Sequence, residues 1–236
     1  MICAVVDSRI SDTCRSRLIA EGFYVIPLPP HKALSAPVAS HTDMLIARIG
    51  DNLILNREYA EEYREIVADI QAHASGYGIT LDDAKLQAEY PSDCVYNCLS
   101  ANGKIYTAHT DNPSLIRIAG DTGKTPVKIK QGYPACTTLL LSDKIAITAD
   151  RGMARVLEND GITSLLIENG DIALPPYEYG FIGGACGVCG NTVYFLGNVA
   201  KHRDYAKITE AIARANMKYV CLSDEELVDL GGILFL

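Results

Sequence analysis

The sequence predicts a closed α/β domain built from five diverged ββαβ units. Turn signals recur near residues 51, 102, 143 and 190, and each lies between two apolar runs that are followed by a helical pattern and a further apolar run. Both ends of the chain are single apolar strands without a neighbour. A spacing of about 40–50 residues is typical of repeat architectures such as propellers. The alternative interpretation is an open α+β sheet whose regularity is accidental.

The first unit begins at the N-terminus and lacks the first strand of its hairpin. We expect a strand over 2–6, a helix over 12–20 and a strand over 23–28. Gly22 is the expected helix cap, because glycine adopts the left-handed conformation readily.

The other four units repeat the complete order of hairpin, helix and strand. Apolar alternation separated by a turn predicts a hairpin, and apolar residues at helical spacing predict the helix that follows. The predicted hairpins cover 41–56, 91–108, 135–150 and 184–198. The predicted helices cover 59–73, 113–118, 153–159 and 202–216, and strands follow near Ile79 and over 127–130, 162–167 and 217–222.

The two chain ends together supply the missing hairpin. Residues 233–236 form an unaccompanied apolar strand, and we expect them to pair antiparallel with residues 2–6. Pairing would complete the fifth unit and remove two exposed strand edges, which soluble proteins avoid.

Composition and charge restrict the class of protein. A chain of 236 residues with 48% hydrophobic and 21% charged residues fits one globular domain over 1–236. The net charge of −8, without a Lys/Arg run, argues against a nucleic-acid partner and mildly favours a small cationic molecule. We expect no signal peptide and no membrane span. Eight cysteines without a secretion signal indicate reduced thiols and a cytoplasmic protein.

Candidate functional residues lie where the innermost strand of each unit should begin. In a ring, these starting points converge on the centre and bring together residues far apart in sequence: His41, Asp43, Asp93, Cys94, Cys136, Gly183, Gly184, Cys186 and Asp229. Paired carboxylates suit a guanidinium group, a thiolate could attack its carbon, and His41 could transfer protons. We expect His41, Asp43, Asp93, Cys136 and Cys186 to face one cavity.

Each candidate also has a purely structural interpretation. Buried cysteines usually pack as small hydrophobic residues, and Asp93 could serve only in a turn. Cys186 and Cys189 form a CxxC pair, but i and i+3 on a strand point to opposite faces, so we expect no metal. We expect no cofactor either, because the run from Gly183 to Gly187 does not match a dinucleotide motif. The glycines are expected to let backbone approach the ring centre closely.

The architecture and one short motif resemble a known fold family. His41-Thr42-Asp43, at the start of a hairpin, is similar to the His-x-Asp motif of the pentein fold of guanidino-group-modifying enzymes. The chain also looks like an uncharacterised bacterial family assigned to that fold. The resemblance implies that His41 is a general acid/base and that Asp43 grips a guanidinium. The family's nucleophilic cysteine follows a glycine-rich stretch in the last strand, and here Gly231-Gly232 is followed by Phe235 or its neighbours instead.

Two functions follow as hypotheses. The first is a pentein-like hydrolase or transferase acting on a small guanidino or amide compound, with Cys186 as the favoured nucleophile and Cys136 as the second choice. Asp43, Asp93, Asp229, Gly183 and Gly184 would then form the binding site. The alternative is a non-catalytic binder of a small molecule that has lost the nucleophile. A structural role, including homo-oligomer formation, is the third choice.

Overall fold

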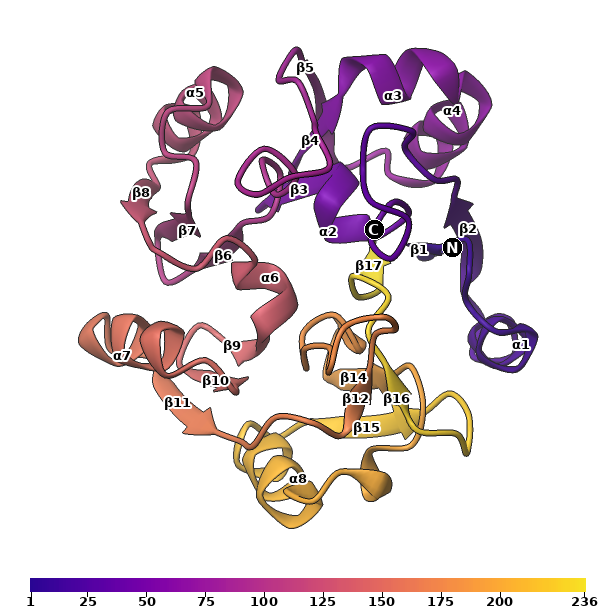
Figure 1. The fold of residues 1–236 in the computed structure, drawn as a ribbon, viewed down its shortest axis with the longest axis vertical. Coiled ribbons are helices and arrows are strands. Elements are labelled where there is room, and N and C mark those ends of the chain that lie inside the picture. Colours follow the sequence, from indigo (N-terminus) through magenta and orange to yellow (C-terminus); the bar gives the residue numbers. More distant parts are fainter.

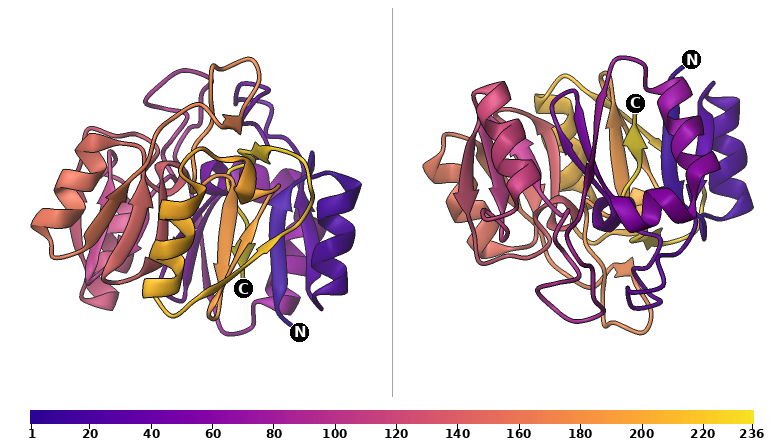
Figure 2. Two further views of the ribbon diagram at one scale, coloured as in Figure 1. Left: turned by 90° about the horizontal axis from the view of Figure 1, so that it is seen from below. Right: turned by 90° about the horizontal axis from the view of Figure 1, so that it is seen from above.

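The computed structural model describes residues 1–236 and repeats one sheet topology five times. Each three-stranded sheet has a first strand antiparallel to the second, and a third strand parallel to the second after a helical crossover. Figure 1 shows the longer helices at the periphery of the molecule, with the strands and two short helices inside, arranged about a common centre. The edge-on views in Figure 2 show the helices α1 (Asp12–Ala20), α4 (Arg64–His73) and α8 (Tyr205–Arg214) standing alongside their sheets.

Four of the sheets follow the chain directly. The first consists of β3 (Ile46–Ile49), β4 (Asn52–Asn56), α3 (Arg57–Glu62), α4 (Arg64–His73) and β5 (Gly78–Asp82), and the second of β6 (Leu99–Ala101), β7 (Lys104–Thr107), α5 (Pro113–Thr122) and β8 (Thr125–Lys128). The third consists of β9 (Thr138–Ser142), β10 (Ile145–Thr148), α7 (Arg151–Asn159) and β11 (Thr163–Leu166). The fourth consists of β13 (Cys186–Cys189), β14 (Thr192–Phe195), the 3₁₀ turn η1 (Val199–Lys201), α8 (Tyr205–Arg214) and β15 (Lys218–Cys221).

The two ends of the chain form the remaining sheet, as the sequence predicted. Strand β17 (Leu234–Phe235) pairs antiparallel with β1 (Cys3–Asp7), with Ala4 opposite Phe235, and β1 pairs parallel with β2 (Tyr24–Leu28) after helix α1 (Asp12–Ala20). Leu236 and Cys3 exchange two further backbone hydrogen bonds at 2.9 Å. The terminal strands therefore complete a unit with the same topology as the other four.

The first strands of the units lie next to one another. Strand β17 contacts β13, which contacts β9, and β9 contacts β6, which contacts β3. Between β3 and β17, the Arg48 guanidinium donates a hydrogen bond of 2.9 Å from Nη1 to the Phe235 carbonyl. Residues at the starts of these strands are thereby brought to the middle of the molecule.

Local sequence signals account for the turns and helix ends. The hairpins turn at Gly50, Asn102-Gly103 and Gly190, all with positive φ, a conformation that glycine and asparagine tolerate. Helix α5 has Asn112 as its N-cap, Pro113 in its first turn and left-handed Gly123 at its end, a combination typical of stable helix termini.

The structure corrects the predicted hairpins at their start. Short helices α2 (Thr42–Leu45) and α6 (Pro134–Thr137) precede β3 and β9, and residues 91–98 form turns, so the inner strands begin several residues later than predicted. A second difference is a small parallel sheet of β12 (Ile172–Ala173) and β16 (Leu227–Val228), which no sequence pattern indicated. Two-residue strands are too short to show alternation.

No helix of the chain combines the length and the apolar character that crossing a bilayer requires.

Candidate functional site

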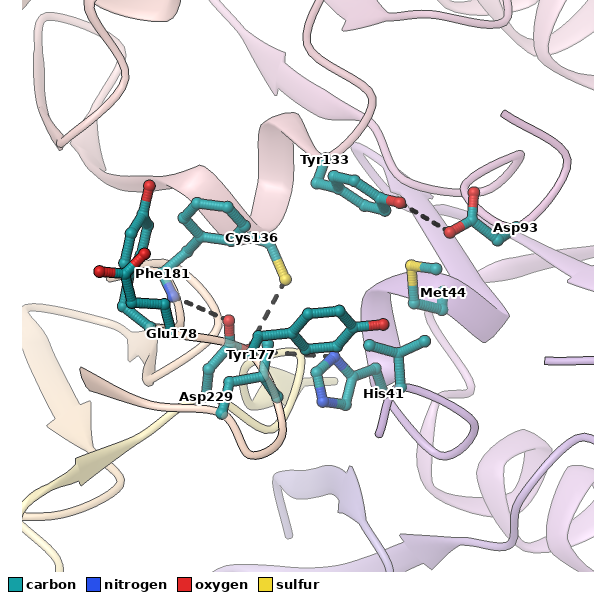
Figure 3. Close-up of a pocket in the computed structure, with 12 residues that line it drawn as sticks. His41, Met44, Asp93, Tyr133, Cys136, Tyr177, Glu178, Phe181 and Asp229 are labelled. Carbon is teal, nitrogen blue, oxygen red and sulfur yellow. Dashed lines mark hydrogen bonds and ion pairs between the residues drawn. The ribbon is translucent and has the colours of Figure 1, made fainter. Parts of the chain in front are cut away.

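A cavity of about 360 Å³ lies where the units meet, and residues from several units line it (Figure 3). Its twelve lining residues include three carboxylates, four aromatic side chains, one histidine and one cysteine, and neither lysine nor arginine. The lining residues are Val38, His41, Met44, Asp93, Tyr133, Cys136, Leu174, Tyr177, Glu178, Tyr179, Phe181 and Asp229. An acidic, aromatic lining favours a small cation, because carboxylates and the faces of aromatic rings both attract positive charge.

His41 is held between two buried carboxylates. The residue immediately precedes α2 and is 1% exposed. Its Nδ1 lies 3.9 Å from Oδ1 of Asp229, and its Nε2 lies 4.0 Å from Oδ2 of Asp7. Neither ring nitrogen has a hydrogen-bond partner within the chain.

Cys136 is the only cysteine that lines the cavity. It lies on α6, whose Ala135 amide donates a hydrogen bond to the Asn97 side chain and so fixes the helical turn. The thiol of Cys136 lies 3.8 Å from Oδ1 of Asp229. Figure 3 shows the sulfur pointing into the space between Asp229 and Met44.

Asp229 forms the floor of the site and is fully buried. It follows β16, and its carboxylate accepts hydrogen bonds from the Phe181 amide at 2.8 Å and the Gly231 amide at 3.0 Å. A Cβ atom at Gly180 or at Gly184 would overlap the Asp229 side chain. The expectation that glycines allow a close approach of backbone at the centre is therefore confirmed at Gly184.

Burial controls the protonation of these groups. Desolvation lowers the pKa of His41 to about 3, and the charge of Arg9 acts in the same direction. Desolvation raises the pKa of Asp229 to about 6, against the two amide hydrogen bonds. The pKa of the Cys136 thiol is raised well above its usual value, first by burial and then by the charges of Asp229 and Asp43. At neutral pH the site therefore holds a neutral imidazole, a neutral thiol and a largely ionised Asp229.

Asp93 contributes a second carboxylate to the same cavity. Its Oδ2 accepts a hydrogen bond of 2.6 Å from the Tyr133 hydroxyl, while its Oδ1 is buried without a partner. In Figure 3, Asp93 and Tyr133 lie on one side of the cavity, and Asp229 and Glu178 lie on the other.

A covering loop, residues 174–181, supplies five of the lining residues. It begins after β12 and is anchored by the Gly180 amide, which donates to the Ile172 carbonyl at 2.7 Å. Tyr177 and Glu178 are exposed. The small sheet of β12 and β16 thus fixes the covering loop and Asp229 to each other.

The structure separates some predicted site residues from this cavity. Asp43, Gly183 and Cys186 line a different cavity of about 150 Å³, with Thr42 and Arg48, and Gly184 lines neither of the two. The prediction that Asp43 and Cys186 share a cavity with His41, Asp93 and Cys136 is therefore wrong. The cause is the unpredicted helix α2, which turns Asp43 away from His41, and the position of Cys186 inside β13.

The environments of Asp43 and Cys186 differ from those expected. The carboxylate oxygens of Asp43 are buried without hydrogen-bond partners, and desolvation raises its pKa to about 7. The Cys186 thiol donates to the Ile182 carbonyl at 3.1 Å, and burial raises its pKa. Cys94 is also buried, with a pKa raised by burial to about 12, and lies outside both cavities.

The last strand, β17, contains no cysteine. Phe235 is 5% exposed and packs against the rings of Phe23 and Tyr194, with centroids 4.7 and 5.3 Å away. The glycine pair before it instead shapes the site, because a Cβ atom at Gly231 would overlap His41.

Several contributors were missed from the sequence. Asp7 ends the first strand and accepts hydrogen bonds from the Arg9 guanidinium, while Tyr133, Tyr177 and Glu178 lie in irregular segments. Of these residues only Asp7 carried a signal in the sequence, because it is a charged residue at the end of an apolar strand. His41, Cys136 and Asp229 also form a set of three side chains that could hold a metal ion.

Comparison with solved structures defines the fold. The chain resembles the dimethylarginine dimethylaminohydrolase (DDAH) of Pseudomonas aeruginosa in complex with citrulline, with a TM-score of 0.58 and 14% identity over 94% of this chain and 91% of that one. It also resembles agmatine deiminase of C. jejuni, with a TM-score of 0.56 and 10% identity over 94% and 87% of the chains. It resembles an amidinotransferase, SxtG from Microseira wollei, with a TM-score of 0.54 and 14% identity over 89% of this chain and 72% of that one.

These relatives are pentein-fold enzymes, and this chain has the pentein fold. At such low identity the likeness concerns the fold alone. Comparison with curated proteins finds no match. Residues 5–234 match a family model described as "Family of unknown function (DUF6873)", and the chain belongs to that family.

Proposed function

We propose that this protein binds a small guanidino compound in the central cavity and acts on it as a hydrolase or transferase, with Cys136 as the nucleophile. One observation carries the proposal: the only cysteine that lines the acidic, aromatic cavity also lies beside a buried histidine and a buried carboxylate. The pentein enzymes of the same fold act on guanidino groups, which agrees with the chemistry of the lining.

The lining supports recognition of a planar cation. Asp229 and Asp93 offer carboxylate oxygens, and the unpartnered Oδ1 of Asp93 is free to accept from a ligand. Cation–aromatic contacts with Tyr177 or Phe181 would add about 0.5–2 kcal/mol. Because no lysine or arginine lines the cavity, a ligand carboxylate would meet only repulsion. We therefore expect agmatine to bind at least about 10-fold more tightly than arginine, as roughly 1.4 kcal/mol of repulsion suffices.

The proposed reaction uses the neutral forms of the site. A bound cation would lower the pKa of the Cys136 thiol. His41 accepts the thiol proton, and the Asp229 carboxylate, 3.9 Å from its Nδ1, stabilises the imidazolium that forms. The sulfur then bonds to the guanidinium carbon, and the displaced amine leaves with the proton from His41. Water, or a second amine in a transferase, releases the product and restores the thiol.

The second candidate is a non-catalytic binder on the same fold. Two observations favour it: the last strand carries no cysteine, and the Cys136 pKa is raised in the free protein. Both candidates require the same ligand class and differ only in turnover.

A paired binding and turnover experiment separates the two. Methylguanidine, agmatine and arginine are titrated calorimetrically into metal-free protein, and ammonia, amine and ureido products are measured after incubation. Turnover that disappears in Cys136→Ala and persists in Cys186→Ala supports the enzyme. Tight binding without turnover supports the binder, and failure of all three compounds to bind contradicts both.

We also propose that the five units form a closed propeller and that the protein is cytoplasmic. The pairing of β17 with β1 and the Arg48–Phe235 hydrogen bond support closure. Eight free cysteines support a reducing compartment.

A further inference from the structure

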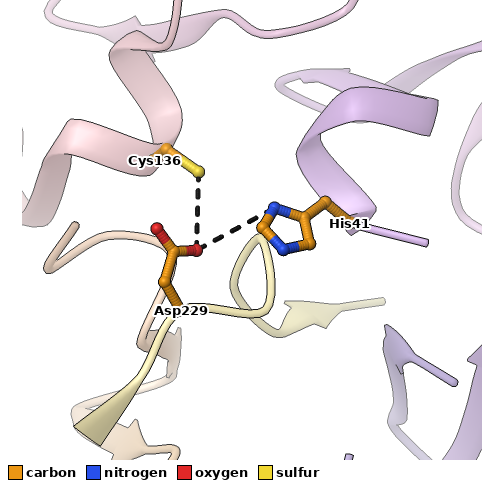
Figure 4. A group of neighbouring side chains, drawn as sticks. All are labelled: His41, Cys136 and Asp229. Carbon is orange, nitrogen blue, oxygen red and sulfur yellow. Dashed lines mark hydrogen bonds and ion pairs between the residues drawn. The ribbon is translucent and has the colours of Figure 1, made fainter. Parts of the chain in front are cut away.

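Three side chains from different units converge at the floor of the cavity with the chemistry of metal ligands. His41 precedes α2, Cys136 lies on α6, and Asp229 follows β16 (Figure 4). Their ligand atoms all lie within 4.8 Å of one another. Nδ1 of His41 and the Cys136 sulfur are 3.9 and 3.8 Å from the same oxygen, Oδ1 of Asp229. All three residues are buried.

The spacing is close to that of a tetrahedral zinc site. Zinc bonds of about 2.0–2.3 Å to nitrogen, oxygen and sulfur place neighbouring ligand atoms about 3.3–3.7 Å apart. The two separations from Oδ1 of Asp229 exceed this range by only a few tenths of an ångström, and the remaining pair, His41 and Cys136, lies within 4.8 Å. A mixed imidazole, thiolate and carboxylate set suits zinc and similar transition metals, whereas magnesium and calcium prefer oxygen ligands.

Groups behind the three side chains are arranged as they are around known metal ligands. A metal-bound histidine usually has a carboxylate near its other ring nitrogen. Here that carboxylate is Asp7, 4.0 Å from Nε2 of His41, and it is itself held by the Arg9 guanidinium at 2.9 Å. The second oxygen of Asp229 is fixed by the Phe181 amide. Neighbouring groups therefore fix the orientation of the Asp229 side chain and lie behind that of His41.

The cluster has polar atoms that the chain does not satisfy. Both nitrogens of His41 are buried and lack hydrogen-bond partners. Unsatisfied buried polar atoms are rare in folded proteins and call for an explanation such as a bound ion. Arg9, whose charge acts on both His41 and Asp229, is already paired with Asp7.

We infer that His41, Cys136 and Asp229 form a transition-metal site of the zinc type, with a fourth coordination position open to the central cavity. Three protein ligands and one open position are the arrangement of catalytic zinc sites. The inference goes beyond the proposed function, because metal binding needs no guanidino chemistry. It also constrains that function: a metal-bound Cys136 sulfur is not free to attack a substrate, so the metal-loaded form is inactive in the proposed thiol reaction.

Cobalt titration tests the site directly. Metal-free protein is titrated with Co²⁺ under anaerobic conditions, and Zn²⁺ is then added in competition. We expect one equivalent of Co²⁺ to produce a thiolate-to-cobalt charge-transfer band and the visible bands of tetrahedral cobalt, and Zn²⁺ to abolish both. Cys136→Ser should lose the charge-transfer band, and Asp229→Asn should bind at least about 10-fold more weakly.

Two further variants keep the test decisive. Cys186→Ser, in the other cavity, should give the wild-type spectrum. Asp7→Asn leaves all three ligands in place and should weaken Co²⁺ binding about 10–100-fold. Absence of one-equivalent binding, or an unchanged charge-transfer band in Cys136→Ser, would overturn the site. Guanidino binding is measured on metal-free protein, so its failure leaves this inference intact, and loss of the cobalt signal leaves the proposed function intact.

Discussion

At the scale of single residues, glycines determine where the functional side chains can lie. Gly231 has φ +69° and contacts His41 so closely that a Cβ atom would overlap its side chain. Gly184 and Gly180 do the same beside Asp229. His41 and Asp229 therefore occupy space that is available only because these three residues have no side chain.

Gly231→Ala should destabilise the protein by about 2–4 kcal/mol, since both left-handed backbone and overlap with His41 penalise the methyl group. Urea denaturation measures the change. Gly22→Ala is the matched control, because Gly22 also has positive φ but nothing lies within 4 Å of its Cβ position; it should cost only about 1–2 kcal/mol. Equal losses in the two variants would contradict the close packing of Gly231 on His41.

The ion pair of Asp171 and Arg203 makes a pH-dependent contribution. Asp171 accepts hydrogen bonds from the Arg203 guanidinium at 2.7 and 2.8 Å, and this contact lowers its pKa to about 2. A depressed folded-state pKa gives stability that is present above the unfolded-state value of 3.8 and is lost as pH falls towards 2. Because Arg203 is largely exposed, solvent screening limits the contribution to about 1 kcal/mol.

Asp171→Asn should therefore be about 1 kcal/mol less stable than the wild type at pH 7, with the difference shrinking below pH 4. Urea denaturation at pH 7, 5, 4 and 3 measures it. Asp121→Asn, whose pair with Arg117 is exposed on both sides, should change stability by less than about 0.5 kcal/mol. A difference at Asp171 that grows as the pH falls would be contrary to this sign.

The residues predicted to line a central cavity do so where the repeat fixed their place in the chain. His41, Cys136 and Asp93 were found because each stands before the first strand of a unit, and these strands meet at the centre. Asp43 was misplaced because one helical turn at 42–45 reverses the direction that an extended strand would give. Cys186 was misplaced because it lies inside β13 and not before it. Asp7 was missed because its partner His41 belongs to another unit.

At the scale of elements, the hairpin turns and outer helices were predictable because glycine, asparagine and apolar periodicity are local signals. The short helices α2 and α6 and the pair β12–β16 depend on contacts made elsewhere in the fold. For example, the Asp229 amide donates to the Ala173 carbonyl, 56 residues away in sequence. Nothing in either segment alone indicates such a pairing.

Strand β17 should stabilise the whole domain, since it completes the terminal sheet and buries Phe235 between two units. Phe235→Ala should cost about 3–5 kcal/mol of unfolding free energy, and deletion of residues 231–236 should cost at least several kcal/mol. Thermal or urea unfolding measures both. Ile19→Ala, at an exposed position on α1, serves as the control and should stay within about 0.5 kcal/mol. Unchanged unfolding of the truncated chain would refute the role of the terminal pairing.

At the scale of the whole molecule, five units of one topology place residues 41, 93, 136 and 229 around one cavity. No unit contains more than part of the site. The repeat could be recognised from turn spacing, and the pairing of the chain ends followed from two orphan strands. The occupant of the cavity could not be predicted from spacing, because its lining also comes from the irregular covering loop.

A crystal structure of the metal-free protein with saturating agmatine tests most directly whether the central cavity binds a guanidinium. We expect the guanidinium inside the cavity, within hydrogen-bonding distance of the Asp229 or Asp93 carboxylate, and within reach of the Cys136 sulfur. Crystals of the Asp93→Asn variant, prepared at the same agmatine concentration, should show lower occupancy of agmatine in the cavity. Agmatine bound only outside the cavity, or a cavity holding water alone at saturation, would contradict guanidinium binding at this site.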